Sequence, residues 1–284
     1  MATVSGAGVG MGMGMGTGAL VPGQVEVGWV AVTPANAVAA EAAAAGVLDE
    51  TERQRAAAFR RDEDRALYQV AHVALRRVLA ERLGRAAAAV TFRRAVCPGC
   101  GQLHGRPEPV DAPGLEFSLS HSGNLALIAL AADPVGADVE RADAFAPGAG
   151  AEVTTQLHPA EQAELAALAD PSPQHRAAAA VRCWVRKEAY LKGTGMGLGR
   201  GVAVDYVGLG PGFETSARPS GALPPAGWEL RSVEVPSGYD AAIALRLPGE
   251  AAGAAGLPGP AGLSGPLGLS GEAVRVRTVE LRLG

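Results

Sequence analysis

The sequence predicts a mixed α+β protein whose two α+β halves meet near Asp133. Its 284 residues allow one large domain or two small ones, and either can bury a core. Apolar residues alternate in several short segments, as in strands, and recur at helical spacing in others. These segments follow one another as strand, helices and strands, and then again as strand, helices and strands.

The expected elements of the first half, 24–134, are a strand at 24–33, helices at 48–60 and 62–83, and a hairpin of strands at 115–119 and 125–130. Val25, Val27 and Trp29 give the first strand its alternation. Asp62 is the candidate N-cap of the long helix, and Gly84 follows it as a stop signal. The hairpin turn is expected at Ser122-Gly-Asn124.

The expected elements of the second half, 135–248, are a strand at 135–140, helices at 159–168 and 176–192, and strands at 202–207, 228–235 and 241–247. A final strand is expected within the terminal segment 272–284. The Gly/Met-rich residues 1–23 lack the composition of a packed core and are expected to be disordered. The Gly/Pro-rich insert at 249–271 is expected to be a flexible loop.

Composition argues against several classes of protein. The formal net charge of −4 speaks against a broad nucleic-acid-binding surface. No apolar run reaches the roughly 20 residues that a membrane span needs, and the N-terminus lacks the pattern of a signal peptide. Three cysteines argue against a disulfide framework. We therefore expect a cytoplasmic protein that binds neither nucleic acid nor membrane.

Lysine is used in one place only. Of the 25 basic residues, 23 are arginine, and the two lysines are Lys187 and Lys192. A lysine ammonium is a compact charge with movable donors, whereas arginine is a rigid planar fork. The confinement of both lysines to one short helical segment suggests that this segment requires an ammonium group. The alternative is that the two lysines lie close together by chance.

Asp138-Val139-Glu140 is the first candidate site motif. On a strand, residues i and i+2 face the same side, so the two carboxylates would converge while Val139 turns to the core. Two converging carboxylates repel each other unless a cation lies between them, and magnesium suits such ligands. The alternative is a solvated strand end, which is the commoner explanation of an isolated D-x-E pattern.

The second motif lies on the helix at 176–192. Trp184, Glu188 and Lys192 are spaced i, i+4 and i+8 and share one helix face. Glu188 and Lys192 would form a weak surface ion pair if the face is solvated. In the functional interpretation, Glu188 supplies a third carboxylate to the metal and Lys192 faces a phosphate.

Two further clusters are less specific. The run 118–122 contains Ser120 and His121 and either closes a hairpin or presents hydroxyls and an imidazole to a phosphate. Cys97, Cys100 and His104 are three soft metal ligands, whereas structural zinc sites usually have four. Cys183 could be the fourth ligand only if the fold brings it close.

Four motifs between residues 105 and 198 resemble, in order and spacing, the 4′-phosphopantetheinyl transferases of the Sfp type. The motifs are Gly105-Arg-Pro107, Phe117-Ser-Leu-Ser-His-Ser122, Val135-Gly-Ala-Asp-Val-Glu140, and Trp184-Val-Arg-Lys-Glu-Ala-Tyr-Leu-Lys192 with Gly195-Met-Gly-Leu198. Each motif alone is unspecific, and four in register are specific. The resemblance covers about 48–207, and more loosely 24–247.

The resemblance implies a pseudo-twofold fold, the 4′-phosphopantetheinyl transferase fold, with coenzyme A and magnesium between the halves. Members transfer 4′-phosphopantetheine from coenzyme A to a serine of acyl or peptidyl carrier proteins and release 3′,5′-ADP. It implies a holo-[acyl-carrier-protein] synthase type of enzyme, with a role in secondary metabolite biosynthesis. Because the pseudo-dimer lies within one chain, a monomer is expected.

The resemblance also implies roles for individual residues. Magnesium would be held by Asp138, Glu140 and Glu188, and coenzyme A would be bound by Arg55, Arg65, Arg106, Ser120, His121, Lys187 and Lys192. Lys192 would stabilise phosphoryl charge, and Glu188 would take the serine proton directly or through a metal-bound water. Ala137 departs from the family, which usually has a branched residue there, and arginines replace lysines in the coenzyme-binding segments.

Two other functions fit the same residues. A carrier- or coenzyme-binding protein of this fold would be non-catalytic and would show a missing metal carboxylate or lysine, and none is missing here. A zinc-stabilised interaction module would depend on Cys97, Cys100 and His104.

Overall fold

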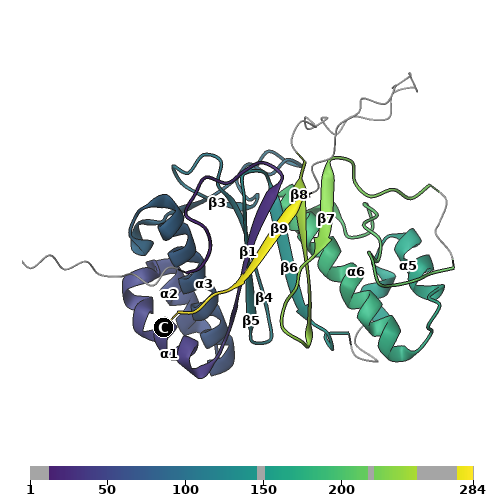
Figure 1. The fold of residues 1–284 in the computed structure, drawn as a ribbon, viewed down its shortest axis with the longest axis horizontal. Helices are drawn as coiled ribbons and strands as arrows, with labels where there is room; N and C mark the ends of the chain where they lie inside the picture. Colours follow the sequence, from purple (N-terminus) through teal and green to yellow (C-terminus); the bar gives the residue numbers. More distant parts are fainter. Residues whose placement is uncertain (1–12, 146–150, 217–220, 248–273, 284) are drawn as a thin grey trace, which may run out of the picture.

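Strand β5 (Leu125–Ala131) is buried along its whole length because both of its faces are covered. Leu125 and Leu127 face a second sheet, whereas Ala126 and Ile128 face helices. With β1 (Gln24–Ala31), β4 (Glu116–Ser122) and β9 (Arg275–Glu280), it forms a sheet of order β4-β5-β1-β9. The computed structural model describes residues 13–145, 151–216, 221–247 and 274–283 (Figure 1).

Three helices cover the outer face of this first sheet: α1 (Pro34–Val47), α2 (Glu50–Ala58) and α3 (Asp62–Leu83). Thr33 caps α1 ahead of Pro34, and Asp49 caps α2 in a reciprocal capping box. Helix α3 begins after Arg61 without a side-chain cap, so the expectation that Asp62 caps it is wrong. Gly84 ends α3 in the left-handed conformation, as predicted.

The second sheet has the order β6-β8-β7 and contains β6 (Val135–Arg141), β7 (Trp228–Ser232) and β8 (Tyr239–Arg246). Its outer face is covered by α6 (Pro173–Thr194), beside which lie α4 (Ala151–Thr155) and α5 (Pro159–Ala166). The inner faces of the two sheets pack together through a shared apolar core. The layers therefore run helices, sheet, sheet, helices (Figure 1), which confirms the mixed α+β class.

Smaller elements connect these layers. The short strands β2 (Phe92–Arg94) and β3 (Pro107–Pro109) pair with each other. The 3-10 turns are η1 (Ala87–Ala89) and η2 (Gly197–Arg200). The C-terminal strand β9 returns to the first sheet, where it lies parallel to β1.

The structure corrects three expectations. Residues 202–207 form turns and loop instead of a strand, and the alanine-rich helix α1 was not predicted. In the tail expected to be disordered, Met13 and Met15 are buried in the core between the first sheet and its helices. Residues 1–12 and the insert 249–271 lie outside the described residues. In the described part, no helix is long and apolar enough to cross a membrane.

Candidate active site

The close contact between β6 and α6 depends on two glycines. A Cβ added to Gly136 would lie 1.9 Å from the carbonyl oxygen of Ala189 and 2.4 Å from the amide nitrogen of Gly193. A Cβ added to Gly193 would lie 2.7 Å from the ring of Trp228. Backbone packs against backbone here, so only glycine fits. The contact brings the helix face with Glu188 and Lys192 over the strand that carries Asp138.

Lys192 and Asp138 form the central ion pair of the site. The Lys192 ammonium lies 2.6 Å from Asp138 Oδ1 and donates to Ser120 Oγ at 3.0 Å. Ser120 Oγ in turn donates to Asp138 Oδ1 at 2.7 Å. Burial raises the pKa of Asp138, and the lysine and the serine only partly offset it. Within the described residues, the buried Oδ2 of Asp138 has no hydrogen-bond partner.

Glu140 and Glu188 complete a group of three mutually interacting carboxylates. Burial and the negative charge of Asp138 raise the pKa of both glutamates, and Glu140 further raises that of Glu188. Ser122 donates to Glu140 Oε2 at 2.6 Å. As predicted, Asp138 and Glu140 share one face of β6 while Val139 lies in the core between the sheets. The group has more negative charge than Lys192 balances.

The donor set of this group fits a hard cation such as magnesium, because it offers carboxylate oxygens and one of them is buried with no partner among the described residues. The three carboxylates are nevertheless not tightly gathered. In the described part of the chain, the one group of three potential ligands whose atoms all lie within 4.8 Å of one another is Cys97, Cys100 and His104.

A ladder of serine hydroxyls joins the two sheets beside the carboxylates. Ser118 Oγ accepts from the N–H of Ala137 at 2.9 Å, and Ser120 Oγ accepts from that of Val139 at 3.4 Å. Ser122 repeats the pattern with the next alternate N–H of β6, at 3.4 Å. Side chains at i, i+2 and i+4 of β4 thus take the place of a neighbouring strand. The hydroxyls of Ser120 and Ser122 also donate to the carboxylates of Asp138 and Glu140.

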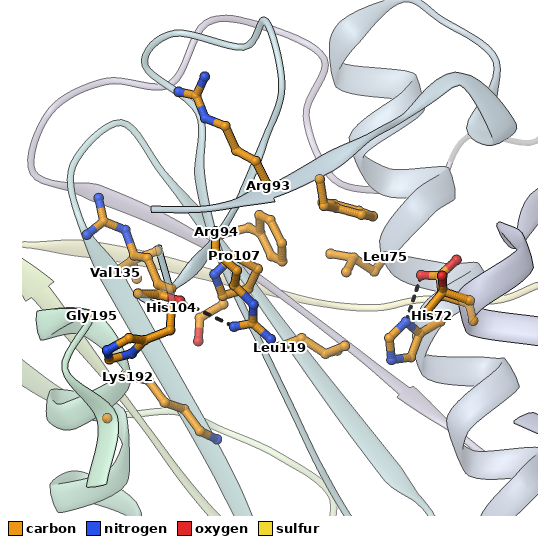
Figure 2. A pocket seen from close by; sticks show the side chains of 18 of the residues that line it. His72, Leu75, Arg93, Arg94, His104, Pro107, Leu119, Val135, Lys192 and Gly195 are labelled. Carbon is orange, nitrogen blue, oxygen red and sulfur yellow. Dashed lines mark hydrogen bonds and ion pairs between the residues drawn. The ribbon is translucent and has the colours of Figure 1, made fainter. Parts of the chain in front are cut away.

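A cavity of about 630 Å³ lies between the two halves and ends at Lys192. Figure 2 shows His72 and Leu75 of α3 on one side and Lys192 and Gly195 on the other. Arg106 also lines it, and its guanidinium meets Glu116 in a double hydrogen bond of 2.9 and 2.8 Å. The cavity therefore brings the predicted residues Arg106 and Lys192 together.

A second cavity of about 940 Å³ lies at the turn between β4 and β5 and contains His121. Partial desolvation of the imidazole, together with the positive charges of Lys192 and Arg55, lowers the pKa of His121, although the residue is exposed. The lowered pKa favours the neutral imidazole, which has one N–H to donate. Ser122, which donates to Glu140, lines the same cavity.

Other predicted residues lie elsewhere. Lys187 is 0% exposed, and its ammonium pairs with the equally buried Glu161 at 2.8 Å. A lysine without exposed surface cannot meet a ligand from solvent, so the prediction that Lys187 binds coenzyme is corrected to a structural role. Arg55 is exposed on α2, and Arg65 pairs with Asp62 at 2.5 Å. Neither arginine lines the two cavities described above.

Two more residues of the sequence motifs are placed by the core between α5 and α6. Trp184 packs there edge-on against Phe145. Cys183 is fully buried in the same core, so it is not a fourth ligand for Cys97 and Cys100.

Some residues of the site were missed by sequence reasoning. The bridging roles of Ser118 and Ser122 could have been suspected from the alternation of serine at 118, 120 and 122. His72 and Met196, which line the first cavity, carry no signal in the sequence because helix and loop residues from distant segments meet there.

Comparison with known protein families gives a match over the region that carries the carboxylates and Lys192. Residues 134–244 match the family model described as the 4′-phosphopantetheinyl transferase superfamily. The matched range includes β6, α6 and most of β8, and with them Asp138, Glu140, Glu188 and Lys192. It covers less than half of the chain and leaves out Ser120 and Arg106. No curated protein matches the chain.

Proposed function

We propose that the protein is a phosphopantetheinyl transferase of the Sfp type, which moves 4′-phosphopantetheine from coenzyme A to a serine of acyl or peptidyl carrier proteins and releases 3′,5′-ADP. One observation carries the proposal: Asp138, Glu140, Glu188 and Lys192 meet where β6 packs on α6, inside the segment that matches the superfamily model.

Coenzyme A would bind in the cavity between the halves. Its volume of about 630 Å³ is within the usual range of small-molecule sites. Arg106 and Lys192 offer positive charge along its wall, and an arginine fork suits phosphate oxygens. Arg106 would exchange Glu116 for a phosphate, or bind it with the free part of its guanidinium. Ser120 contacts Lys192 at one wall of this cavity, whereas His121 lines the second cavity and would act from there. Arg55 and Arg65 would contribute only from outside both cavities.

Magnesium would be held by Asp138, Glu140 and Glu188. Burial raises the pKa of all three acids, and neighbouring carboxylates raise those of Glu140 and Glu188 further, so a cation bound among them would relieve an unfavourable arrangement. Among the described residues, Oδ2 of Asp138 has no hydrogen-bond partner and is available to such a cation. When bound, the ion would neutralise charge on the pyrophosphate.

The chain's own residues would then divide the remaining work. The carrier serine Oγ forms a bond to the β-phosphorus of coenzyme A, and the bond from that phosphorus to 3′,5′-ADP breaks. Glu188 takes the serine proton; burial and neighbouring charge raise its pKa, and no hydrogen bond joins its carboxylate to another described residue. Lys192, whose side chain is 32% exposed, presents its ammonium to the charge on the departing 3′,5′-ADP.

The arrangement of strands supports a pseudo-twofold relation between the halves. In the first, β1 pairs with β5 and β5 with β4; in the second, β6 pairs with β8 and β8 with β7. In each half the first strand thus pairs with the last of the following hairpin. A monomer follows from such an internal pseudo-dimer, and a cytoplasmic location follows from coenzyme A and carrier proteins as substrates.

The deciding experiment is a loading assay. The full chain is incubated with coenzyme A, magnesium and a panel of apo carrier proteins of fatty-acid, polyketide and peptide type, and intact carrier masses are measured. The expected result is the addition of one phosphopantetheine, abolished by chelation and by Glu188→Gln. Unchanged masses across the panel would overturn the proposal.

The alternative, a non-catalytic binding protein of the same fold, predicts a different pattern. Such a protein would bind coenzyme A with equal affinity in the wild type and in Glu188→Gln, and would load no carrier. Calorimetric titration with coenzyme A, run beside the loading assay, distinguishes the two functions.

A further inference from the structure

The loop between β2 and β3 has almost no apolar contacts of its own. Its base is closed by Ala95 N–H to Arg106 O at 3.0 Å and by Gly105 N–H to Ala95 O at 2.9 Å. Beyond this base, Val96 and Leu103 are 58% and 72% exposed, and Cys97 is the one buried residue of 96–104. Something other than hydrophobic packing must therefore fix the conformation of this loop.

The backbone of the loop is shaped around the sulfur of Cys97. Cys97 N–H donates to Gln102 O at 2.8 Å, and Gly101 N–H donates to Cys97 O at 2.9 Å. Gly101 adopts φ 75°, which closes this tight turn and favours glycine. The N–H groups of Cys100 and Gly99 point at the Cys97 sulfur. These backbone contacts fix the position of that sulfur within the loop.

Two further ligand atoms lie next to this sulfur. The ligand atoms of Cys97, Cys100 and His104 all lie within 4.8 Å of one another, and Cys100 Sγ is 2.9 Å from His104 Nε2. A sulfur and a nitrogen bound to one tetrahedral zinc ion at ~2.3 and ~2.1 Å would be about 3.6 Å apart. Only small side-chain shifts separate the observed arrangement from that geometry.

We propose that Cys97, Cys100 and His104 bind one zinc ion, with the fourth position open to solvent. Two thiolates and an imidazole select a borderline-soft ion over magnesium, which the carboxylate site would take. Among such ions, zinc takes Cys sulfur and His nitrogen ligands in tetrahedral geometry and has no redox chemistry of its own, which suits a clamp. The fourth position stays open because Cys100 and His104 are exposed and Cys183 is buried in another core.

The zinc ion would position one wall of the cavity between the halves. His104, Gly105 and Arg106 line that cavity, and Figure 2 shows His104 on the side of Lys192 and Gly195. The tip of the loop also packs on Met196, because a Cβ on Gly99 would lie 2.7 Å from its methyl group. A clamp at 97–104 therefore fixes the backbone that carries Arg106. That last consequence rests on the proposed binding of coenzyme A.

The test measures metal directly. The full chain is purified, incubated with zinc, dialysed, and analysed by inductively coupled plasma mass spectrometry. We expect one zinc per chain in the wild type and in the control Cys183→Ala, and loss of that zinc in the double variant Cys97→Ser/Cys100→Ser. Cobalt titration gives a second readout, since a thiolate-to-cobalt absorption band should appear in the wild type and be absent from the double variant.

The inference is overturned if the wild type retains no zinc, or if the double variant retains as much as the wild type. A disulfide between Cys97 and Cys100 in protein purified from cells, seen as a mass lower by two hydrogens, overturns it as well. Circular dichroism of the double variant checks that it remains folded, and His104→Gln gives an independent variant for which the same loss is expected.

The outcomes separate this inference from the proposed function. A zinc-free protein that loads carriers at full rate would contradict the zinc site and support the proposed transferase activity. A zinc-binding protein that loads no carrier would support the zinc site and contradict the proposed activity. If both hold, the double variant should show a higher KM for coenzyme A with kcat preserved, as a positioning role requires.

Discussion

Replacing Lys192 with alanine should destabilise the protein because Asp138 would lose its ion-pair partner. Asp138 is 3% exposed, and what remains to it is the hydrogen bond from Ser120. Breaking a buried pair by removing one partner typically costs 3–5 kcal/mol. Lys192 is 32% exposed, so water can replace part of its charge, and we expect a loss of about 3 kcal/mol in the free energy of unfolding. That corresponds to a fall in Tm of about 6–12 °C for a chain of this size.

The loss should depend on pH with a definite sign. Burial already raises the pKa of Asp138, and removal of the ammonium raises it further. A carboxyl whose folded pKa lies above its unfolded value binds more protons when folded, so stability increases as pH falls through the folded pKa. The Lys192→Ala variant should therefore be most destabilised at neutral pH and above, and should approach the wild type in mild acid.

Thermal melts of metal-free protein across this pH range, followed by circular dichroism, measure both effects. The control Arg282→Ala removes an exposed arginine that lies 3.5 Å from Glu280, and it should change stability by no more than about 0.5 kcal/mol. Lys192→Arg keeps a cation and should fall between the two. A Lys192→Ala variant that melts like the control, or a loss that is the same at every pH, would refute this account of Asp138.

Three further changes test the site. Glu188→Gln should lower carrier loading about 10²–10⁴-fold by removing the proposed base, which stopped loading assays would measure. It should also raise the stability of the metal-free protein by about 1 kcal/mol at neutral pH, because the repulsion of Glu188 by Asp138 and Glu140 is removed; thermal melts would measure this effect. Burial raises the pKa of Glu188 in the metal-free protein, so the loading rate should fall on the acid side at limiting magnesium, and a rate–pH profile should show this fall move to lower pH as magnesium is increased, because the bound cation favours the carboxylate. Gly136→Ala should cost more than about 4 kcal/mol in urea unfolding, because the new methyl would meet the carbonyl of Ala189, whereas Gly199→Ala, with open space around it, is the matched control.

The parts of the fold that the sequence predicted are those with a clear apolar pattern, either a continuous apolar run as in β5 or an alternation as in β6. The run 125–130 and the alternation in 135–140 are strands, and the carboxylates and Val139 lie on opposite faces of β6 as expected. The hairpin turn also lies where Gly123 and Asn124 predict it. Prediction succeeds here because a short continuous apolar run indicates a strand buried on both faces, and alternation indicates a strand whose two faces differ.

Prediction failed where the sequence has no contrast between apolar and polar positions, or where the structure depends on contacts between residues far apart in the sequence. Helix α1 consists mostly of alanine, so no apolar stripe stands out, and the features that indicate a helix are the Thr33 cap and Pro34. Residues 202–207 have strand-like composition, yet their segment supplies carbonyls to Arg186 and Lys187 and so leaves the sheet. The burial of Met13 and Met15 likewise depends on a surface assembled from other segments.

Composition treats the two lysines alike, whereas their positions on the helix give them different surroundings. Their exclusive use singled out both Lys187 and Lys192, but positions five apart on a helix point about 140° away from each other at 3.6 residues per turn. One ammonium therefore faces β6 and its carboxylates, while the other turns to α5 and to Glu161. Glu161 also accepts from Val207 N–H at 2.7 Å, so that pair ties α5, α6 and the loop at 207 together. Both lysines place a compact ammonium beside a buried carboxylate. Only the neighbours of that carboxylate distinguish the structural pair of Lys187 from the pair of Lys192, which we propose to be catalytic.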